Sequence, residues 1–369
     1  MENKKILVGI THGDTNGIGY ELIFKTFSTP EMLELCTPII YGSPKVAAYH
    51  RKALDMQANF TIINQVEEAR DGRVNLLTCM NEDVKVEIGT PTPESHQAAM
   101  KALDHALEDL RNHSIQVLVT LPISKSADGK GGSQFEYMQE KLGEANKATV
   151  LMGNDLMRIA LATKDMAIKD VSNHITIEHV SQKMIVLHTA LKRDLRIFNP
   201  RIAVLALNPN ANGKEETDVI KPAIAQLEEQ HIEAFGPFTA DDFFGNHKYG
   251  AFDGILAMYH DQGTMPFNTI NGGSNYVLLA GLSYVCTSPT HTPCFEIAGQ
   301  NKGDESSLRK AIYVGIDVYR NRINYDNPYE NPLQKLYHEK RDEGEKIRFS
   351  IPKKHENSIK EKKAPEIIE

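Results

Sequence analysis

Short runs of apolar and β-branched residues alternate along this chain with longer helical patterns, and that alternation narrows the possible folds more than any other feature. Several runs are almost wholly apolar, which suits strands covered on both faces, as in parallel sheets. Strands that alternate with helices form βαβ units, so we expect an α/β fold. The expected strands are Ile6–Ile10, Pro38–Tyr41, Phe60–Ile63, Val74–Cys79, Val117–Leu121, Arg158–Ala162, Arg201–Leu207 and Gly254–Tyr259.

Two segments carry an apolar stripe at helical spacing, Glu94–Arg111 and Ser306–Arg320. A chain of 369 residues is longer than one domain usually is, so we expect about two domains. The glycine-rich stretch Asp128–Ser133 predicts a flexible hinge. The segment Glu339–Glu369 is rich in acids and bases and poor in apolar residues, which predicts a solvated tail.

The charge balance argues against several classes of partner. Lys and Arg number 41 and Asp and Glu 49, a net charge of −8, which does not favour nucleic acid or an anionic membrane. No apolar run approaches the roughly 18–20 residues of a membrane span, and no signal peptide is evident, so we expect a cytoplasmic protein. The four cysteines are scattered without a C-x-x-C pair, which predicts buried free thiols.

The segment Gly9–Glu21 follows an expected strand and begins an expected helix. Its glycines permit a tight turn and a close backbone approach, and a helix N-terminus attracts anions. The glycines do not follow G-x-G-x-x-G, and no acid stands suitably at the end of a second strand, so a standard dinucleotide fingerprint is absent. The residues alone leave two interpretations open, an anion-binding turn and a purely structural one.

Polar residues also follow three other expected strands. His260 and Asp261 come after the last of them, at the kind of strand end where open α/β sheets place ligands. Such a pair can bind a divalent metal or move protons, although a structural histidine is as common an outcome. Lys125 follows the strand Val117–Leu121 and can hold a phosphate or carboxylate, or can simply be exposed. The Asn-rich turn after Leu207 is typical of a loop.

Several motifs coincide in order and spacing. They are G-I-T-H-G-D-x-N-G-I-G-x-E from Gly9, T-x-P-I-x-K from Thr120, A-L-A-T from Ala160, L-N-P from Leu207, A-M-Y-H-D-Q-G from Ala257 and T-S-x-x-H from Thr287. In this combination the chain resembles the 4-hydroxythreonine-4-phosphate dehydrogenase (PdxA) family of vitamin B6 biosynthesis. The resemblance spans about residues 5–322 and leaves only the charged tail outside it.

The resemblance implies a two-domain fold like that of isocitrate and isopropylmalate dehydrogenases, with mostly parallel sheets and an interdomain cleft. It places residues 1–127 with 296–335 in one α/β domain, residues 128–295 in a second domain that carries dimerisation, metal and substrate contacts, and residues 336–369 in the tail. It also implies a homodimer that uses NAD(P) and a divalent metal (Zn, Mg, Mn or Co). Such enzymes oxidise a phosphorylated hydroxy amino acid, and the product then decarboxylates.

Matching positions imply roles for individual residues. The catalytic candidates are His260, Asp261 and Lys125, and the three metal positions fall at His260, Asp165 and Asn210. The substrate-binding candidates are Glu136, Asn268, Asn275, Cys286 and His291. The cofactor-binding candidates are Asp14, Gly17 and Gly19.

Several of these positions depart from the family pattern. Asp165 and Asn210 stand where the family has metal-binding histidines, which makes the donor set harder and weaker for zinc. Asn268 and Cys286 stand where the family has a Lys and an Arg, whose charge-assisted bonds contribute roughly 1.5–3 kcal/mol each. The scaffold motifs are kept while the site residues change. Besides the usual activity, two alternatives stay open: a divergent paralogue with another hydroxy-acid substrate, and a non-catalytic sensor or heterodimer partner.

Overall fold

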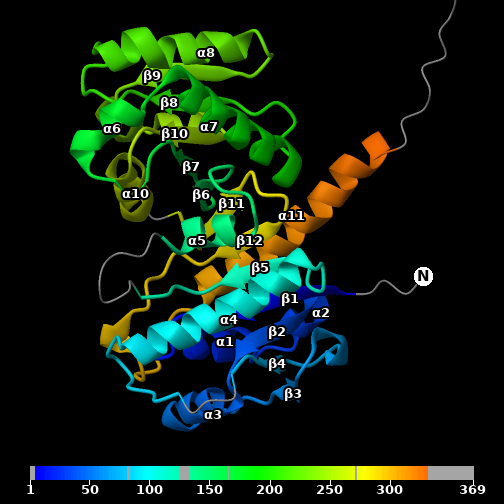
Figure 1. The fold of residues 1–369 in the computed structure, drawn as a ribbon. Coiled ribbons are helices and arrows are strands. Elements are labelled where there is room, and N and C mark those ends of the chain that lie inside the picture. The colour runs from blue at the N-terminus through cyan, green and yellow to red at the C-terminus, as the bar shows by residue number, and fades with distance from the viewer. Residues whose placement is uncertain (1–4, 81–83, 125–132, 165, 271, 331–369) are drawn as a thin grey trace, which may run out of the picture. The chain divides into compact units, whose positions relative to one another are not determined.

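The computed structural model describes residues 5–80, 84–124, 133–164, 166–270 and 272–330, and its contacts divide the chain into Met1–Asn327 and Pro328–Glu369. The first unit is built on one twelve-stranded sheet in the order β3-β4-β2-β1-β5-β12-β11-β6-β7-β10-β8-β9 (Figure 1). The strands are β1 (Ile6–Thr11), β2 (Cys36–Gly42), β3 (Thr61–Ile63), β4 (Asn75–Thr78), β5 (Val117–Thr120), β6 (Thr149–Gly153), β7 (Arg158–Leu161), β8 (Ile202–Leu205), β9 (Ala234–Phe238), β10 (Gly254–Ala257), β11 (Tyr276–Ala280) and β12 (Val285–Ser288).

The sheet is mostly parallel. β11 runs antiparallel to β12 and to β6, and β6 runs antiparallel to β7, whereas the other neighbouring strands pair in parallel. All eight expected strands are present, and the expected α/β fold is confirmed. The sequence analysis missed β6, β9, β11 and β12, and three of these make up the antiparallel centre of the sheet.

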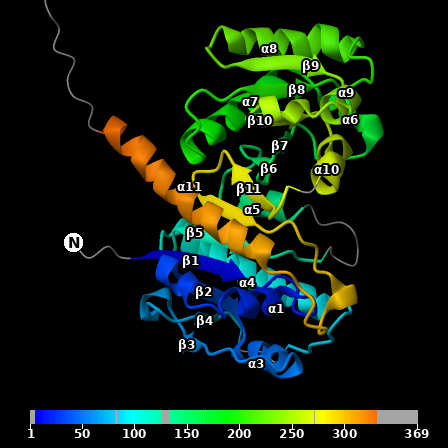
Figure 2. The same cartoon turned by 180° about the vertical axis from the view of Figure 1, so that it is seen from behind.

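Helices cover both faces of the sheet. Leu118 of β5 packs in one core cluster with Leu103, whereas its neighbour Val117 packs in another with Leu308 and Ile312. Successive strand residues point to opposite faces, so α4 (Pro93–Arg111) and α11 (Ser306–Glu330) lie on opposite sides of this part of the sheet, as the two views show (Figures 1 and 2). The α-helices are α1 (Gly19–Thr26), α2 (Glu31–Leu35), α3 (Pro44–Ala53), α4 (Pro93–Arg111), α5 (Gln134–Lys141), α6 (Ile168–His174), α7 (Ile177–Thr189), α8 (Lys221–Glu228), α9 (Ala240–Gly245), α10 (His260–Thr269) and α11 (Ser306–Glu330).

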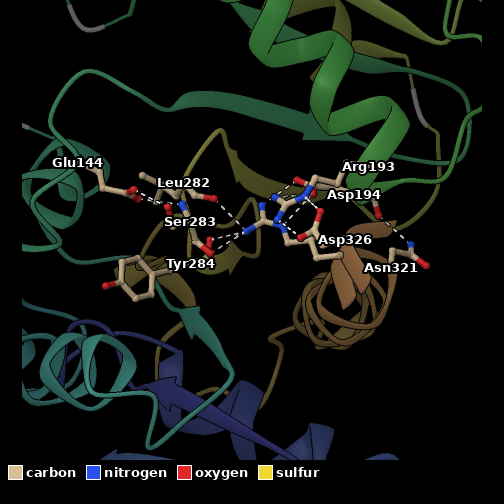
Figure 3. A network of polar contacts seen from close by, with 9 residues as sticks. Glu144, Arg193, Asp194, Leu282, Ser283, Tyr284, Asn321 and Asp326 are labelled. Atoms are coloured by element: carbon tan, nitrogen blue, oxygen red, sulfur yellow. Dashed lines mark hydrogen bonds and ion pairs between the residues drawn. The ribbon is translucent and has the colours of Figure 1, made fainter. Parts of the chain in front are cut away.

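Helix α11 extends ten residues beyond the expected end at Arg320 and carries a buried arginine there. The guanidinium of Arg322 holds the carboxylate of Asp194 with two hydrogen bonds of 2.8 Å (Figure 3). Its Nη1 donates to the carbonyls of residues 282–284, which form the turn between β11 and β12, at 2.9–3.2 Å. Arg322 and Asp194 are only 5% and 2% exposed, so this pair joins three chain segments inside the protein.

Asp194 ends a π-helical turn, Ala190–Asp194, which follows α7. The residue before it, Arg193, holds Asp326 in a second, more exposed ion pair, one helical turn along α11 from Arg322 (Figure 3). On the other side of the network, the amide and hydroxyl of Ser283 donate to Glu144 at 2.9 and 2.7 Å. The tight β11–β12 turn is therefore held by charged groups from two distant segments.

Two further expectations, the hinge and the charged tail, fall largely or wholly on residues that the structure does not describe. Positions 128–132 of the expected hinge and the expected tail 336–369 lie outside them. Among the helices that are described, none is both long and apolar enough to cross a membrane.

Candidate functional site at the carboxyl edge of the sheet

The parallel strands β7, β10 and β8 are neighbours, and the chain leaves each of them at the same edge of the sheet. Hydrogen bonds continue beyond the strands, from the Ala162 amide to the Ala257 carbonyl at 2.8 Å and from the Thr163 hydroxyl to the Met258 carbonyl at 2.7 Å. Neighbouring strands lie about 4.8 Å apart, so the segments that follow them are close together. Open α/β sheets bind ligands at such an edge.

A buried glutamine binds two of these strand ends together. Gln262 accepts from the Met258 amide at 2.7 Å and donates to the Ala206 carbonyl, beyond β8, at 2.6 Å. Both partners are main-chain groups, one beyond β10 and one beyond β8, so the glutamine of the Y-H-D-Q-G segment holds the two loops that follow these strands together. The sequence analysis did not single out this residue.

His260 is the first residue of α10, directly beyond β10. Its Nδ1 lies 2.8 Å from the Asp261 carboxylate and 3.3 Å from the Thr264 hydroxyl, and its side chain is half exposed. A carboxylate beside one ring nitrogen fixes the orientation of the imidazole. The other nitrogen, Nε2, is then the atom that can take a proton from a substrate or bind a cation.

The loop that follows β8 carries Asn210, and one carboxylate organises it. Glu216 is fully buried, and its Oε1 accepts from the amides of Leu207 and Asn208 at 2.8 Å each. Its Oε2 accepts from the Asn208 side chain at 3.0 Å and from the Gly213 amide at 2.7 Å. Burial alone would raise the pKa of this carboxyl, but these hydrogen bonds outweigh it and lower the pKa. Asn210 itself is exposed on the loop.

Two of the candidate residues, Asp165 and Lys125, lie outside the described residues. Within the described part of the chain, no group of three or more His, Cys, Asp or Glu side chains is placed to hold a metal ion. Of the described donors, the imidazole of His260 suits transition metals such as zinc and the amide oxygen of Asn210 suits harder cations, and a metal site at these residues stays a prediction.

The loop between β1 and α1 is packed inside the protein. The Asp14 amide donates to the Pro122 carbonyl at 3.1 Å, and the Asp14 carboxylate accepts from the Ser124 hydroxyl at 2.5 Å. A Cβ at Gly17 would stand 2.6 Å from the Pro293 carbonyl oxygen, and one at Gly19 would stand 1.9 Å from the His12 oxygen. The glycines are therefore required by backbone packing, and cofactor binding by these residues stays a prediction.

His12, in the same loop, is a fully buried histidine that the sequence analysis did not weigh. Its Nδ1 lies 2.6 Å from the Gly13 carbonyl, and its ring stacks on Tyr20 with 5.1 Å between centroids. Burial lowers the pKa of His12 to about 4. Between about pH 4 and pH 6.5 the His12 imidazole therefore stays neutral in the folded protein, whereas it is protonated in the unfolded chain.

This difference predicts a loss of stability in acid. The unfolded chain gains a proton at His12 as the pH falls through 6.5, whereas the folded protein does so only near 4. The free energy of unfolding should therefore drop by about 2 kcal/mol more between pH 8 and pH 5 in the wild type than in His12→Leu. Urea unfolding of both proteins at the two pH values measures it, and other histidines contribute equally to both. Equal drops in the two proteins would exclude this role for His12.

The hairpin of β11 and β12 brings two further candidates to its open end. Asn275 precedes β11, and His291 lies three residues beyond β12. Ser307, at the start of α11, accepts from the Thr290 amide at 3.1 Å and donates to the Asn275 carbonyl at 2.6 Å. The Asn275 Oδ1 and His291 Nδ1 atoms are buried without a hydrogen-bond partner among the described residues. Buried polar atoms are normally paired, so each of these two can take part in one further hydrogen bond, and a substrate contact by either residue stays a prediction.

The comparisons with known proteins decide the family. The pattern of the family described as "Pyridoxal phosphate biosynthetic protein PdxA" matches residues 34–315. A 4-hydroxythreonine-4-phosphate dehydrogenase from Bacteroides thetaiotaomicron is 48% identical over 360 residues, which cover 95% of this chain and 98% of that protein. The chain belongs to the PdxA family. A relative from Oceanobacillus iheyensis, named for D-threonate 4-phosphate dehydrogenase activity, is 31% identical and covers 86% of this chain and 98% of its own length.

Solved structures of PdxA proteins have the same fold. The 4-hydroxythreonine-4-phosphate dehydrogenase of Burkholderia phymatum aligns with a TM-score of 0.68 at 26% identity, over 86% of this chain and 99% of that one. The enzyme of that name from Klebsiella pneumoniae aligns with a TM-score of 0.72 at 21% identity, over 86% and 99%, which supports the fold alone.

Three positions that the PdxA resemblance assigned to the substrate have clear surroundings in this structure. Glu136 accepts from the Ser133 amide at 3.1 Å and completes a capping box at the start of α5. Asn268 is exposed on α10. Cys286 is fully buried in β12 within an apolar cluster, and burial raises the pKa of its thiol to about 12. In this structure Cys286 is a core residue and Glu136 a helix cap, and contacts of all three with a substrate stay predictions.

Proposed function

We propose that this protein is an NAD(P)-dependent dehydrogenase that oxidises 4-hydroxythreonine 4-phosphate in pyridoxal phosphate biosynthesis. The observation that carries the proposal is the 48% identity to an enzyme of that name over 95% of the chain. It is supported by His260 and Asp261, a histidine and carboxylate 2.8 Å apart at the edge where α/β sheets bind ligands.

The residues divide the chemistry between them. Bound NAD(P)⁺ would take the hydride from the substrate carbon, and a divalent cation would polarise the hydroxyl oxygen. His260 Nε2 would face that hydroxyl, either to accept its proton or to hold the cation, while Asp261 keeps the ring in place. Asp165 and Asn210 would complete the cation's ligands. Loss of hydride and proton turns the alcohol into a ketone, and the resulting β-keto acid loses CO₂.

The unpaired Asn275 Oδ1 and His291 Nδ1 atoms are the polar atoms that we assign to the bound substrate, together with Lys125 for an anionic group. We also propose a homodimer in the cytoplasm, with one domain of residues 1–127 and 296–335 and another of residues 128–295. Sedimentation of the purified protein tests the dimer: a single species near twice the chain mass of 41.2 kDa supports it, and a monomer contradicts it.

The identity of the substrate is tested by turnover. Purified protein is incubated with NAD⁺ or NADP⁺ and with Mg²⁺, Mn²⁺, Zn²⁺ or Co²⁺ in turn, and NAD(P)H is followed by absorbance. We expect turnover of 4-hydroxythreonine 4-phosphate and none of unphosphorylated 4-hydroxythreonine. Preference for D-threonate 4-phosphate would instead support a paralogue with another hydroxy acid, as the relative from O. iheyensis suggests. Binding of the substrate without turnover under any condition would favour a sensor.

A further inference from the structure

The loop from Asn208 to Gly213 lies at the same sheet edge as His260 but contains no regular structure of its own. Its residue Ala211 has a left-handed backbone, with a φ of 50°, and the Ala211 amide donates to the Asn208 carbonyl at 3.1 Å. Asn210 and Asn212 are exposed on it. A loop of this kind needs an outside support to present one side chain in a fixed direction.

That support comes from the next segment of the chain. Glu216 lies in a π-helical turn, Glu215–Ile220, which leads into α8. Its two oxygens accept four hydrogen bonds of 2.7–3.0 Å, and all four donors belong to residues 207, 208 and 213, on either side of Asn210. The carboxylate thus holds both ends of the loop at once. π-helical turns occur frequently at functional sites.

The main chain at Gly213 packs directly against the side chains of Asn208 and Glu216. A Cβ there would stand 2.3 Å from the Asn208 side-chain nitrogen and 2.7 Å from Glu216 Oε2. The main chain at Gly213 is therefore as close to the carboxylate as it can come. Each oxygen of Glu216 accepts from two donors. In Glu216→Gln an NH₂ group replaces one of these oxygens, so two of the four hydrogen bonds would become repulsive contacts between two donors.

We propose that Glu216 is a positioning residue, which fixes the Asn208–Gly213 loop so that Asn210 points to the ligand that His260 also contacts. The inference rests on the proposed function in one respect, since that ligand is taken to be a divalent cation with the anionic substrate. Residues that support metal ligands in this way typically change metal affinity by 10- to 100-fold when they are replaced.

The experiment compares Glu216→Gln with a matched variant, Asp194→Asn. Asp194 is also a buried acid in a π-helical turn, but it serves Arg322 rather than this loop. Mn²⁺ affinity of the substrate-free protein is measured by calorimetry, and KM and kcat are measured beside it. We expect Glu216→Gln to weaken Mn²⁺ binding by 10- to 100-fold, and Asp194→Asn to lower stability while leaving Mn²⁺ affinity unchanged. Asn210→Ala should weaken Mn²⁺ binding similarly. Because both substitutions act through Asn210, the double variant Glu216→Gln/Asn210→Ala should bind Mn²⁺ no more weakly than the single variant with the lower affinity.

Several outcomes would overturn the inference. These are unchanged Mn²⁺ affinity in Glu216→Gln, fully additive effects of the two substitutions, an equal loss of Mn²⁺ affinity in Asp194→Asn, and a wild-type protein that binds no Mn²⁺. The proposed function fails separately, by absence of turnover. Mn²⁺ binding that depends on both Glu216 and Asn210 in an inactive protein would sustain the positioning role alone.

Discussion

Replacing Arg322 by methionine should lower the free energy of unfolding by about 3–5 kcal/mol, the range found when one partner of a buried ion pair is removed. Asp194 would be left as a buried carboxylate without its two 2.8 Å hydrogen bonds. The carbonyls of residues 282–284 would lose their shared donor in the same step. Methionine fills much of the volume of the arginine stem, so the loss would come from the polar contacts and not from a cavity.

Denaturant unfolding of the two proteins measures this loss. Asp326→Asn is the matched control, because Asp326 lies one helical turn along α11 from Arg322 but its ion pair with Arg193 is partly exposed, and such pairs contribute about 0–1 kcal/mol. Arg322→Met combined with Asp194→Leu should recover part of the stability, since no unpaired charge remains. A loss for Arg322→Met as small as that for Asp326→Asn would show that the buried network contributes little.

The parallel parts of the sheet could be predicted because each strand there is buried on both faces. Such strands appear as short apolar runs that any reader of the sequence can find, as Ile6–Thr11 and Gly254–Ala257 illustrate. β9 was missed because its A-F-G-P-F sequence contains a Gly-Pro pair, which favours a turn. β11 and β12 were missed although β11 is also a buried apolar run, Y-V-L-L-A, and β12 pairs in parallel with β5 as well as antiparallel with β11.

The candidate site was only partly predictable, for a related reason. A strand end followed by His260 is visible in sequence, because the ligand-binding edge of an α/β sheet follows from topology. The residues that hold the site, Glu216 and Gln262, act on main-chain groups of loops that no local pattern identifies. Cys286, a position matched by the family resemblance, is fully buried in the core, and this burial could not be predicted from the match.

Removing the imidazole of His260 should have the largest effect on turnover. We expect His260→Ala to lower kcat/KM by about 10²–10⁴-fold, the contribution of a positioned acid or base, with little change in stability because the side chain is half exposed. Asp261→Asn should have a smaller effect of about 10- to 100-fold, because it only weakens the orientation of the ring across the 2.8 Å contact.

The matched control is His174→Ala, another exposed histidine, whose Nδ1 lies 2.9 Å from the Asp170 carbonyl at the end of α6. Steady-state rates with the phosphorylated substrate and unfolding curves are measured for all three variants. His174→Ala should keep wild-type rates, which separates a general loss of surface histidine from a loss at the sheet edge. If His260→Ala retained more than a tenth of the wild-type kcat/KM while folding normally, the reaction would not pass through this imidazole, and the lost proton would have to go to another group, for which Lys125 and Asp165 are the sequence candidates.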